Sequence, residues 1–478
     1  MKHRKGCMLQ LKTKAVVLTS LLLVSALIIL TNIYPALSNP ATLLVPSQYP
    51  TIQAAITAAG PGDTIIVATG VYNESNLVIT QNGLTLQGES RVNTIIDGQN
   101  GNNHVIAVKA NNVVVRGFTI RNARTVYKAG IWCNSSSNAY LADNTFSGNF
   151  YSVHAQYCTD VKVVSSTFSG DSANDLCADI RIYYCQSGLI ENNTILSAHV
   201  GAFVIQSSNF MIKNNTFSSS ILTGVTVSYS EQNWVARNIF RDNNSSISIK
   251  YNGTNTVIGN TISNSATAGL LLQNAPNNVI HHNNLVNNAL QVKFLDSSPT
   301  THIWSTSLPI AEGNYWSNYT GTDANKDGIG DTAYNVGTGN QDPYPLIGRF
   351  AEFSVTNQTG IYNVYTISNS LIQNFGFDQV ARKIDFSVSG TSGTTGICRV
   401  VFPKGLVLSP YTVFVNGVNQ TYGSAGNSTH VALYFSYVYG SQASSVVIVP
   451  EFPAMLILPL LLLLTLLIAA LKRKKYSG

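Results

Sequence analysis

The segment Met211–Ser220 reads "MIKNNTFSSS", and near-copies of it stand on both sides of it along the chain. Residues 189–198 read "LIENNTILSA", residues 234–243 read "WVARNIFRDN" and residues 256–265 read "TVIGNTISNS". Each copy places an apolar residue, a polar residue, Asn, one further residue and a second apolar residue in the same order. Such a phrase belongs either to an active site or to a repeated structural unit, and its spacing separates the two.

The repeat has a regular length. The apolar residue that closes the motif returns after 22 to 27 residues, and most intervals are 22 or 23. Intervals of this size are typical of solenoids, in which a unit too small to bury its own apolar face stacks on its copies. Each unit also holds a second short alternating run, as in residues 224–230 and 246–252, which predicts a β-strand. Stacked coils of this kind form parallel sheets along the solenoid axis. The closing positions are Ile120, Phe146, Phe168, Ile195, Phe217, Phe240, Ile262 and Leu285.

The repeated Asn stands two positions before the closing apolar residue in most coils. Asn tolerates a left-handed backbone better than other non-glycine residues, so we expect it to form the corner between two sheets. Asn side chains stacked from coil to coil also form a hydrogen-bonded ladder. This predicts a structural role and not a catalytic one for Asn144, Asn193, Asn215, Asn238, Asn260 and Asn283.

The repeats resemble those of right-handed parallel β-helix proteins of the pectate-lyase-like superfamily. Residues 49–74, "YPTIQAAITAAGPGDTIIVATGVYNE", resemble the opening of that superfamily, with a capping helix, a turn and a first strand. Ile52, Ala55, Ile56 and Ala59 fall on one helical face, and Gly60 ends the helix. We therefore expect an all-β chain whose residues 39–312 form a right-handed parallel β-helix of about ten or eleven coils.

Residues 313–348 resemble the end of the β-helix domain in the NosD family of periplasmic copper-enzyme accessory proteins, and in archaeal surface proteins that share it. Inside this cap, "DANKDGIGD" (residues 323–331) has the spacing of a calcium loop, although Tyr334 stands where the usual bidentate acid would be. We expect a structural Ca²⁺ there, with a plain Asp/Gly turn as the alternative. The expected ligands are Asp323, Asn325, Asp327, the carbonyl of Ile329, and Asp331.

Copper is implied by the NosD resemblance alone. The histidines are scattered, and neighbours on a strand point to opposite faces, so His281 and His282 are not expected to chelate one ion. Cys133, Cys158 and Cys185 sit at similar places in three successive coils. They form either a ladder of small buried thiols or a metal or disulfide site.

Acidic residues are rare in the repeats, and they cluster in the lengthened coil "DSANDLCADIRIYY" (residues 171–184). The resemblance implies lyases, esterases and glycosidases as possible relatives, and a glycosidase needs two carboxylates at a defined separation. The candidate catalytic residues are Asp175, Asp179 and Arg181, with His154 one coil earlier and His199 one coil later. Alternatively, Asp179 and Arg181 pair with each other on a solvated strand.

The β-helix faces are rich in Asn, Ser, Thr and Tyr, which suits contact with a polysaccharide or surface glycan. Aromatic rings stack on sugars, while amides and hydroxyls bond to sugar hydroxyls. Candidate aromatic contacts, each also compatible with ordinary strand packing, are Tyr157, Tyr183, Tyr184, Tyr229 and Tyr251. The chain also carries Asn-x-Ser/Thr acceptor sequences, for example at Asn73, Asn318, Asn357, Asn419 and Asn427.

From about residue 350 the repeat stops. Residues 349–448 read as seven or eight short alternating strands with Gly, Asn and Ser turns, which predicts a β-sandwich. They resemble the Ig-like module that often precedes the anchor in archaeal surface proteins. Such a domain works as a stalk that holds the β-helix off the membrane.

The two ends predict hydrophobic helices. Residues 1–38 combine a basic start, an apolar run and small residues near Ser38, which is typical of a signal peptide, or of an uncleaved anchor. Residues 449–478 hold an apolar stretch long enough for a bilayer, closed by "KRKK", which predicts a single anchor with the body outside the cell.

Only 10% of the residues are charged, and the formal net charge of +6 comes largely from these ends. The chain therefore has no basic stripe for nucleic acid. The sequence favours a non-enzymatic surface module for glycan binding, adhesion or association with a surface layer. A carbohydrate-active enzyme and a copper-handling accessory protein are the alternatives.

Overall fold

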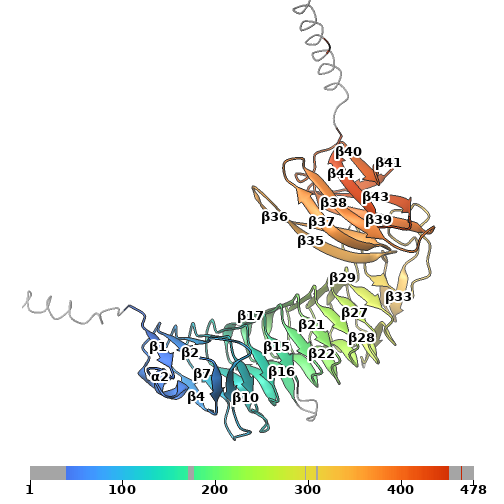
Figure 1. The fold of residues 1–478 in the computed structure, drawn as a ribbon. Coiled ribbons are helices and arrows are strands. Elements are labelled where there is room, and N and C mark those ends of the chain that lie inside the picture. The colour runs from blue at the N-terminus through green and yellow to red at the C-terminus, as the bar shows by residue number, and fades with distance from the viewer. Residues whose placement is uncertain (1–38, 171–176, 297, 308–309, 452–464, 466–478) are drawn as a thin grey trace, which may run out of the picture.

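The computed structural model describes residues 39–170, 177–296, 298–307, 310–451 and 465 (Figure 1). A long parallel β-helix is followed by an antiparallel β-sandwich, which leans over the C-terminal end of the β-helix (Figure 1). Within the described residues, no helix combines the length and the apolar character needed to cross a bilayer. The predicted signal segment lies outside the described residues, and so does the predicted anchor beyond residue 451, apart from Thr465.

The β-helix is right-handed and has about eleven turns built from three parallel sheets. Sheet A contains β1 (Thr42–Val45), β2 (Thr64–Val67), β5 (Thr85–Gly88), β8 (Val114–Arg116), β11 (Tyr140–Ala142), β14 (Thr159–Val164), β17 (Gln186–Glu191), β20 (Ser208–Lys213), β23 (Trp234–Ala236), β26 (Thr256–Ile258) and β29 (Val279–His281). Sheet B contains β3 (Gly70–Tyr72), β6 (Thr94–Asp97), β9 (Thr119–Arg121), β12 (Thr145–Ser147), β15 (Thr167–Ser169), β18 (Thr194–Leu196), β21 (Thr216–Ser218), β24 (Ile239–Arg241), β27 (Thr261–Ser263), β30 (Asn284–Val286) and β32 (Tyr315–Trp316). Sheet C contains β4 (Leu77–Ile79), β7 (Ile106–Val108), β10 (Ala129–Asn134), β13 (Tyr151–Gln156), β16 (Ala178–Tyr183), β19 (Val200–Ile205), β22 (Thr223–Ser228), β25 (Ser245–Lys250), β28 (Ala268–Gln273) and β31 (Val292–Phe294).

The closing apolar residues of the motif form one inward row on sheet B, as predicted. From Ile120 to Leu285 they are in register in successive strands, and each is fully buried. Identical rings stack directly, with centroids 4.8 Å apart for Phe146 and Phe168. Burial of each such side chain contributes about 1.5–3 kcal/mol, so this row is a main source of stability.

The predicted Asn ladder exists, but its residues do not form the left-handed corner, so that part of the prediction was wrong. The corner belongs to the preceding residue, as Asn192 and Asn214 show with φ of 56° and 57°. The repeated Asn itself is buried. The backbone N–H of Asn193 donates to Asn215 Oδ1 at 2.9 Å, and Asn215 Nδ2 donates to the carbonyl of Ile190 at 2.8 Å. The side chain therefore saturates backbone groups that the corner leaves without a strand partner.

Each of the other two corners carries its own hydrogen-bonded ladder of polar side chains, which was not predicted from the sequence. Between sheets C and A, Asn233 Oδ1 accepts from Phe210 N, and Asn255 Oδ1 accepts from Asn233 N. Between sheets B and C, Asn243 Oδ1 accepts from Ser220 N at 2.9 Å. Buried amides thus secure all three edges of the solenoid.

A short helix covers the N-terminal end of the core, as expected. Helix α2 (Ile52–Ala58) begins at Thr51, whose side chain accepts a hydrogen bond from Ala54 N at 3.1 Å. Ile52, Ala55 and Ile56 are buried against the first strands. The helix thereby covers the apolar N-terminal end of the solenoid core.

The C-terminal domain consists of two five-stranded antiparallel sheets with a common apolar core. It has more strands than predicted, because the short strands β41 (Val418–Gln420) and β42 (Gly423–Gly426) each form one edge of a sheet. One sheet contains β35 (Arg349–Asn357), β36 (Gly360–Ser368), β39 (Thr395–Pro403), β43 (His430–Val438) and β42 (Gly423–Gly426). The other contains β37 (Leu371–Asp378), β38 (Lys383–Ser389), β44 (Ser444–Pro450), β40 (Tyr411–Val415) and β41 (Val418–Gln420). A small hairpin of β33 (Tyr334–Gly337) and β34 (Asn340–Asp342) precedes the domain.

The β-helix and the sandwich are joined by a buried ionic contact. Arg399 Nε donates to Glu312 Oε1 at 2.7 Å, and both side chains are almost completely buried. The other Glu312 oxygen lies 3.0 Å from His282 Nε2. Breaking one member of such a pair leaves an uncompensated buried charge, so the geometry of the junction is well defined.

Candidate functional site

The outward face of sheet C carries a row of aromatic and basic side chains, which we call the sheet C strip. Trp132, His154, Arg181 and Phe203 occupy equivalent positions on β10, β13, β16 and β19, because strand register pairs each with the next. Their inward-facing neighbours are buried aliphatic residues and one thiol. The two-residue alternation of these strands therefore directs the row outward. Trp132, Arg181 and Phe203 are half-buried there, and His154 is 7% exposed.

Arg181 and His154, which come from successive coils, are in direct contact. Arg181 Nη1 donates to His154 Nε2 at 2.6 Å. Burial, followed by the adjacent Arg181 charge, lowers the pKa of His154 to about 3. The imidazole is therefore neutral near pH 7, and it accepts through Nε2 while Nδ1 carries the proton. The guanidinium also lies 4.4 Å from the ring of Tyr183 and 5.4 Å from that of Tyr151, a cation–π arrangement.

Trp132 extends the strip toward the N-terminus. Its ring stacks on His104 with centroids 4.6 Å apart, and the Lys109 ammonium lies 5.7 Å from the ring. Burial, followed by the charges of Lys128 and Lys109, lowers the pKa of His104 to about 4. Near pH 7 the positive charge of the strip therefore comes from Lys and Arg side chains and not from histidine.

Four of the five candidate tyrosines line the corner beside the strip, directly after the strands of sheet C. Tyr157, Tyr184, Tyr229 and Tyr251 all have left-handed φ between 50° and 66° and follow the sheet C strands. Their side chains are 38% to 55% exposed, and they stack in pairs, with Tyr229 and Tyr251 centroids 4.6 Å apart. Left-handed φ is unfavourable for a bulky residue, so the corner places these rings outside at a conformational cost. Tyr183, by contrast, is a strand residue of the strip.

Asp179 does not stand on the exposed strip. Its side chain is 4% exposed, and Oδ1 accepts from Ser152 Oγ at 2.9 Å, while Oδ2 has no partner in the described part of the chain. Burial raises the pKa of Asp179 to about 7. The alternative that Asp179 pairs with Arg181 is not realised, because Arg181 faces His154 and the tyrosines. Asp179 is the second residue of β16, and this position faces the interior: a Cβ on the equivalent Gly201 of β19 would lie 2.7 Å from the buried Phe217 ring.

The remaining catalytic candidates do not complete an acid–base pair among the described residues. His199 is 8% exposed, and its Nδ1 has no described partner. Asp175 lies in residues 171–176, outside the described part. On the sheet C strands β10, β13, β16, β19, β22, β25 and β28, the row equivalent to Arg181 and the outward row that follows it carry no carboxylate.

The predicted calcium ligands lie in one loop beside the domain junction. Asp323 accepts from the backbone N–H groups of Asp327 and Gly328 at 3.0 and 2.9 Å, and Asp331 accepts from Ala324 N at 2.8 Å. Burial, and then the nearby carboxylates of Asp327 and Asp331, raise the pKa of Asp323. Asn325 donates to Asp327 through its amide, and Ile329 N donates to Asp327 Oδ1. The loop thus concentrates negative charge, although no three His, Cys, Asp or Glu side chains converge on a metal position in the described residues. Calcium remains a prediction.

The histidine pair departs from expectation. His281 ends β29, but His282 has a left-handed φ of 59°, so the two Nδ1 atoms approach to 3.2 Å instead of pointing to opposite faces. His282 also packs against Phe350 and bonds to Glu312. With one nitrogen of His282 facing Glu312 and no third ligand in the described region, these residues do not fit a copper site.

The three cysteines do not form one ladder. Cys158 N donates to Cys185 Sγ at 3.3 Å, and Cys185 N donates to Ser207 Oγ, so two of them belong to a corner ladder of small polar residues. Hydrogen bonding with Cys185 lowers the pKa of Cys158 to about 7. Cys133 lies instead within β10, in register with Ala155, and all three are free thiols. The coil that separates β10 from β13 has 22 residues, whereas Cys133 and Cys158 are 25 residues apart, so Cys133 lies three positions earlier in its coil.

Four residues in and around the strip were not predicted from the sequence: His104, Lys109, Trp132 and Tyr151. Trp132 lies 22 residues before His154, one ordinary coil length, so extending the repeat interval backward from the candidate site identifies it. The contacts of Trp132 with His104 and Lys109 arise from the stacking of successive coils, so no local sequence pattern predicts them.

Two protein families match the β-helix. The model of the family described as "Periplasmic copper-binding protein (NosD)" matches residues 165–321, and that of a "Protein of unknown function (DUF1565)" matches residues 45–204. The chain is 40% identical over 80 residues to a "Probable ABC transporter binding protein NosD" of Stutzerimonas stutzeri, covering 17% of each chain. It is 26% identical over 302 residues to a "Cell surface glycoprotein" of Methanothermus fervidus, covering 54% of this chain and 49% of the relative. The chain thus spans half or less of the length of these relatives.

Solved structures with similarity to the chain include a bacteriophage CBA120 tailspike protein 2 domain and a periplasmic alginate epimerase, AlgG. The tailspike domain has a TM-score of 0.44 at 11% identity, covering 86% of this chain and 79% of the domain. The epimerase has a TM-score of 0.31 at 16% identity, covering 54% of this chain and 72% of the enzyme.

Proposed function

We propose that this protein is a cell-surface module that binds glycans along the sheet C strip without turning them over. The observation that carries the proposal is the in-register row of Trp132, His154, Arg181 and Phe203 on the outward face of sheet C, where the two aromatic rings and Arg181 are half-buried. Aromatic rings present apolar faces to sugar C–H groups, and Arg donates to sugar oxygens. The similarity to a cell surface glycoprotein supports an extracellular location.

The stack of coils suits a repeating ligand. Successive strip residues are one coil apart, about 4.8 Å, so a linear polymer lying along the axis meets a new side chain at each step. The strip is also preorganised, because Arg181 is already held by His154 and by two aromatic rings. Little side-chain entropy is lost on binding, which favours affinity.

The test is a glycan array with the full-length protein and two tryptophan variants. Trp132→Ala removes the ring from the strip, whereas Trp234→Ala removes a 45% exposed tryptophan from sheet A and serves as the matched control. We expect loss of binding only in Trp132→Ala. Equal binding by both variants and the unchanged protein contradicts the assignment to the strip.

A carbohydrate-active enzyme is the second candidate, because Asp179 has a pKa near 7 close to the strip. Such a value suits a general acid or base, but burial of its oxygens separates it from a polymer on the surface. Polysaccharide lyase and hydrolase assays with Asp179→Asn separate the candidates. Turnover that Asp179→Asn abolishes favours the enzyme, and binding without turnover favours the proposed module.

A further inference from the structure

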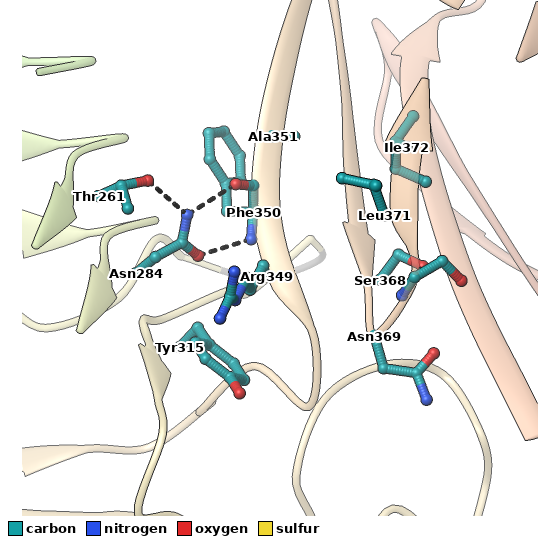
Figure 2. A pocket seen from close by; sticks show the side chains of 11 residues that line it. Thr261, Asn284, Tyr315, Arg349, Phe350, Ala351, Ser368, Asn369, Leu371 and Ile372 are labelled. Carbon is teal, nitrogen blue, oxygen red and sulfur yellow. Dashed lines mark hydrogen bonds between the residues drawn. The ribbon is translucent and has the colours of Figure 1, made fainter. Parts of the chain in front are cut away.

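A cavity lies in the angle between the β-helix and the sandwich, and we call it the elbow pocket (Figure 2). Its volume is about 420 Å³. The β-helix contributes Thr261, Asn284 and Tyr315, and the sandwich contributes Arg349 and the segment 368–372. Ligand pockets measure about 300–1,000 Å³, so this cavity suits a small ligand such as one or two sugar residues.

The walls of the elbow pocket are held together by Asn284, which is 3% exposed. Its Nδ2 donates to the carbonyl of Phe350 and its Oδ1 accepts from Phe350 N, both at 2.8 Å. Figure 2 shows these bonds joining the β-helix to the first strand of the sandwich. With the buried Arg399–Glu312 pair nearby, they make the pocket a preformed feature.

Arg349 is the charged group of the pocket, and its charge is not neutralised by an ion pair within the described residues. Two other arginines at the same junction are paired: Arg237 lies 3.0 Å from Glu352, and Arg399 lies 2.7 Å from Glu312. Arg349 is exposed at the start of β35. A guanidinium in this state offers a planar fork of donors that matches a carboxylate.

Most other polar groups of the lining are already used. Ser370 Oγ lies within hydrogen-bond distance of two tyrosine hydroxyls, and Asn369 bonds to the backbone of β39 through its oxygen and its nitrogen. What remains is the Arg349 fork, the half-buried ring of Tyr315, and the apolar side chains of Leu371 and Ile372 across the cavity (Figure 2). One cation beside an aromatic ring and an apolar wall suits a carboxylate carried on a compact ring with C–H faces.

We propose that the elbow pocket binds one acidic sugar residue, a uronate, with Arg349 on its carboxylate and Tyr315 against its ring. The assignment rests on the proposed glycan-binding function and adds a charge-selective site distant in sequence from the sheet C strip. A polymer that contacts both sites is selected for acidic units at the elbow.

The test is isothermal titration of the full-length protein with an oligogalacturonate and with the same oligosaccharide after reduction of its carboxyl groups. Arg349→Gln keeps a polar side chain and removes the charge, and the exposed Arg382 on the far turn of the sandwich supplies the control Arg382→Gln. We expect Arg349→Gln to weaken oligogalacturonate binding about tenfold or more and to leave binding of the reduced form unchanged. Arg382→Gln is expected to bind as the unchanged protein does.

The outcomes separate the two proposals. If Trp132→Ala lowers oligosaccharide binding while Arg349→Gln does not, the elbow assignment is overturned and the strip stands. If no glycan binds the unchanged protein, both the elbow assignment and the proposed function are wrong. The sugar assignment is also overturned if a short acidic peptide binds in an Arg349-dependent way and the oligogalacturonate does not.

Discussion

Asn238→Ala is expected to destabilise the β-helix, because it removes one member of the buried Asn ladder. The side chain is 1% exposed and makes four hydrogen bonds between coils. Its Oδ1 accepts from the N–H and the amide of Asn215 at 2.9 and 3.0 Å, and its Nδ2 donates to the Ile212 carbonyl and to Asn260 at 2.8 and 3.0 Å. The variant leaves the buried Asn215 N–H and the Ile212 carbonyl without partners. At about 1–3 kcal/mol for each unsatisfied buried group, we expect the free energy of unfolding to fall by about 3–5 kcal/mol.

The measurement is urea denaturation followed by circular dichroism, with hydrogen exchange of the Asn215 amide as a local readout. Asn93→Ala is the control, because Asn93 is exposed and its side chain makes no bond among those found in the described residues. We expect that change to alter the free energy of unfolding by no more than about 0.5 kcal/mol. An Asn238→Ala effect as small as the control, with an unchanged exchange rate at Asn215, refutes the ladder argument.

Burial raises the pKa of Asp179 to about 7, above its value near 3.9 in an unfolded chain, so the folded state retains the proton and stability falls as pH rises from about 4 to 7. Asp179→Asn is therefore expected to raise the free energy of unfolding by on the order of 2–4 kcal/mol at pH 8 and little at pH 4, and equal effects at both pH values contradict this. Calcium is expected to raise the melting temperature of the full-length protein, EDTA to reverse the rise, and Asp323→Asn to weaken it; a calcium-independent melting temperature in thermal scans refutes the predicted site. Cys185→Ser is expected to cost less than about 1.5 kcal/mol in urea denaturation, because Ser207 and Ser230 already occupy the same ladder position, and a loss above 3 kcal/mol argues against that equivalence.

The sequence determined the architecture of the β-helix. A closing apolar residue every 22 to 27 positions demands stacked coils, because one coil cannot bury its apolar face alone. The inward row from Ile120 to Leu285 follows directly from this periodicity, and the capping helix after Thr51 follows from the helical spacing of its apolar residues. The motif that ends in Phe217 is thus a structural unit. Its role is recognised from its repetition along the chain and not from reactive groups within it.

Only the tertiary structure decided which polar residues meet. His154 and Arg181 are 27 residues apart, yet strand register brings them within 2.6 Å, whereas Asp179, two residues from Arg181, turns inward. Local patterns report which face a residue occupies, but coil lengths that vary from one repeat to the next set the register between strands. The elbow pocket depends in addition on how the two domains pack. Arg349 and Tyr315 line one cavity because the sandwich docks on the β-helix. That docking is set by buried contacts such as Arg399–Glu312, whose partners are 87 residues apart and carry no shared sequence signal.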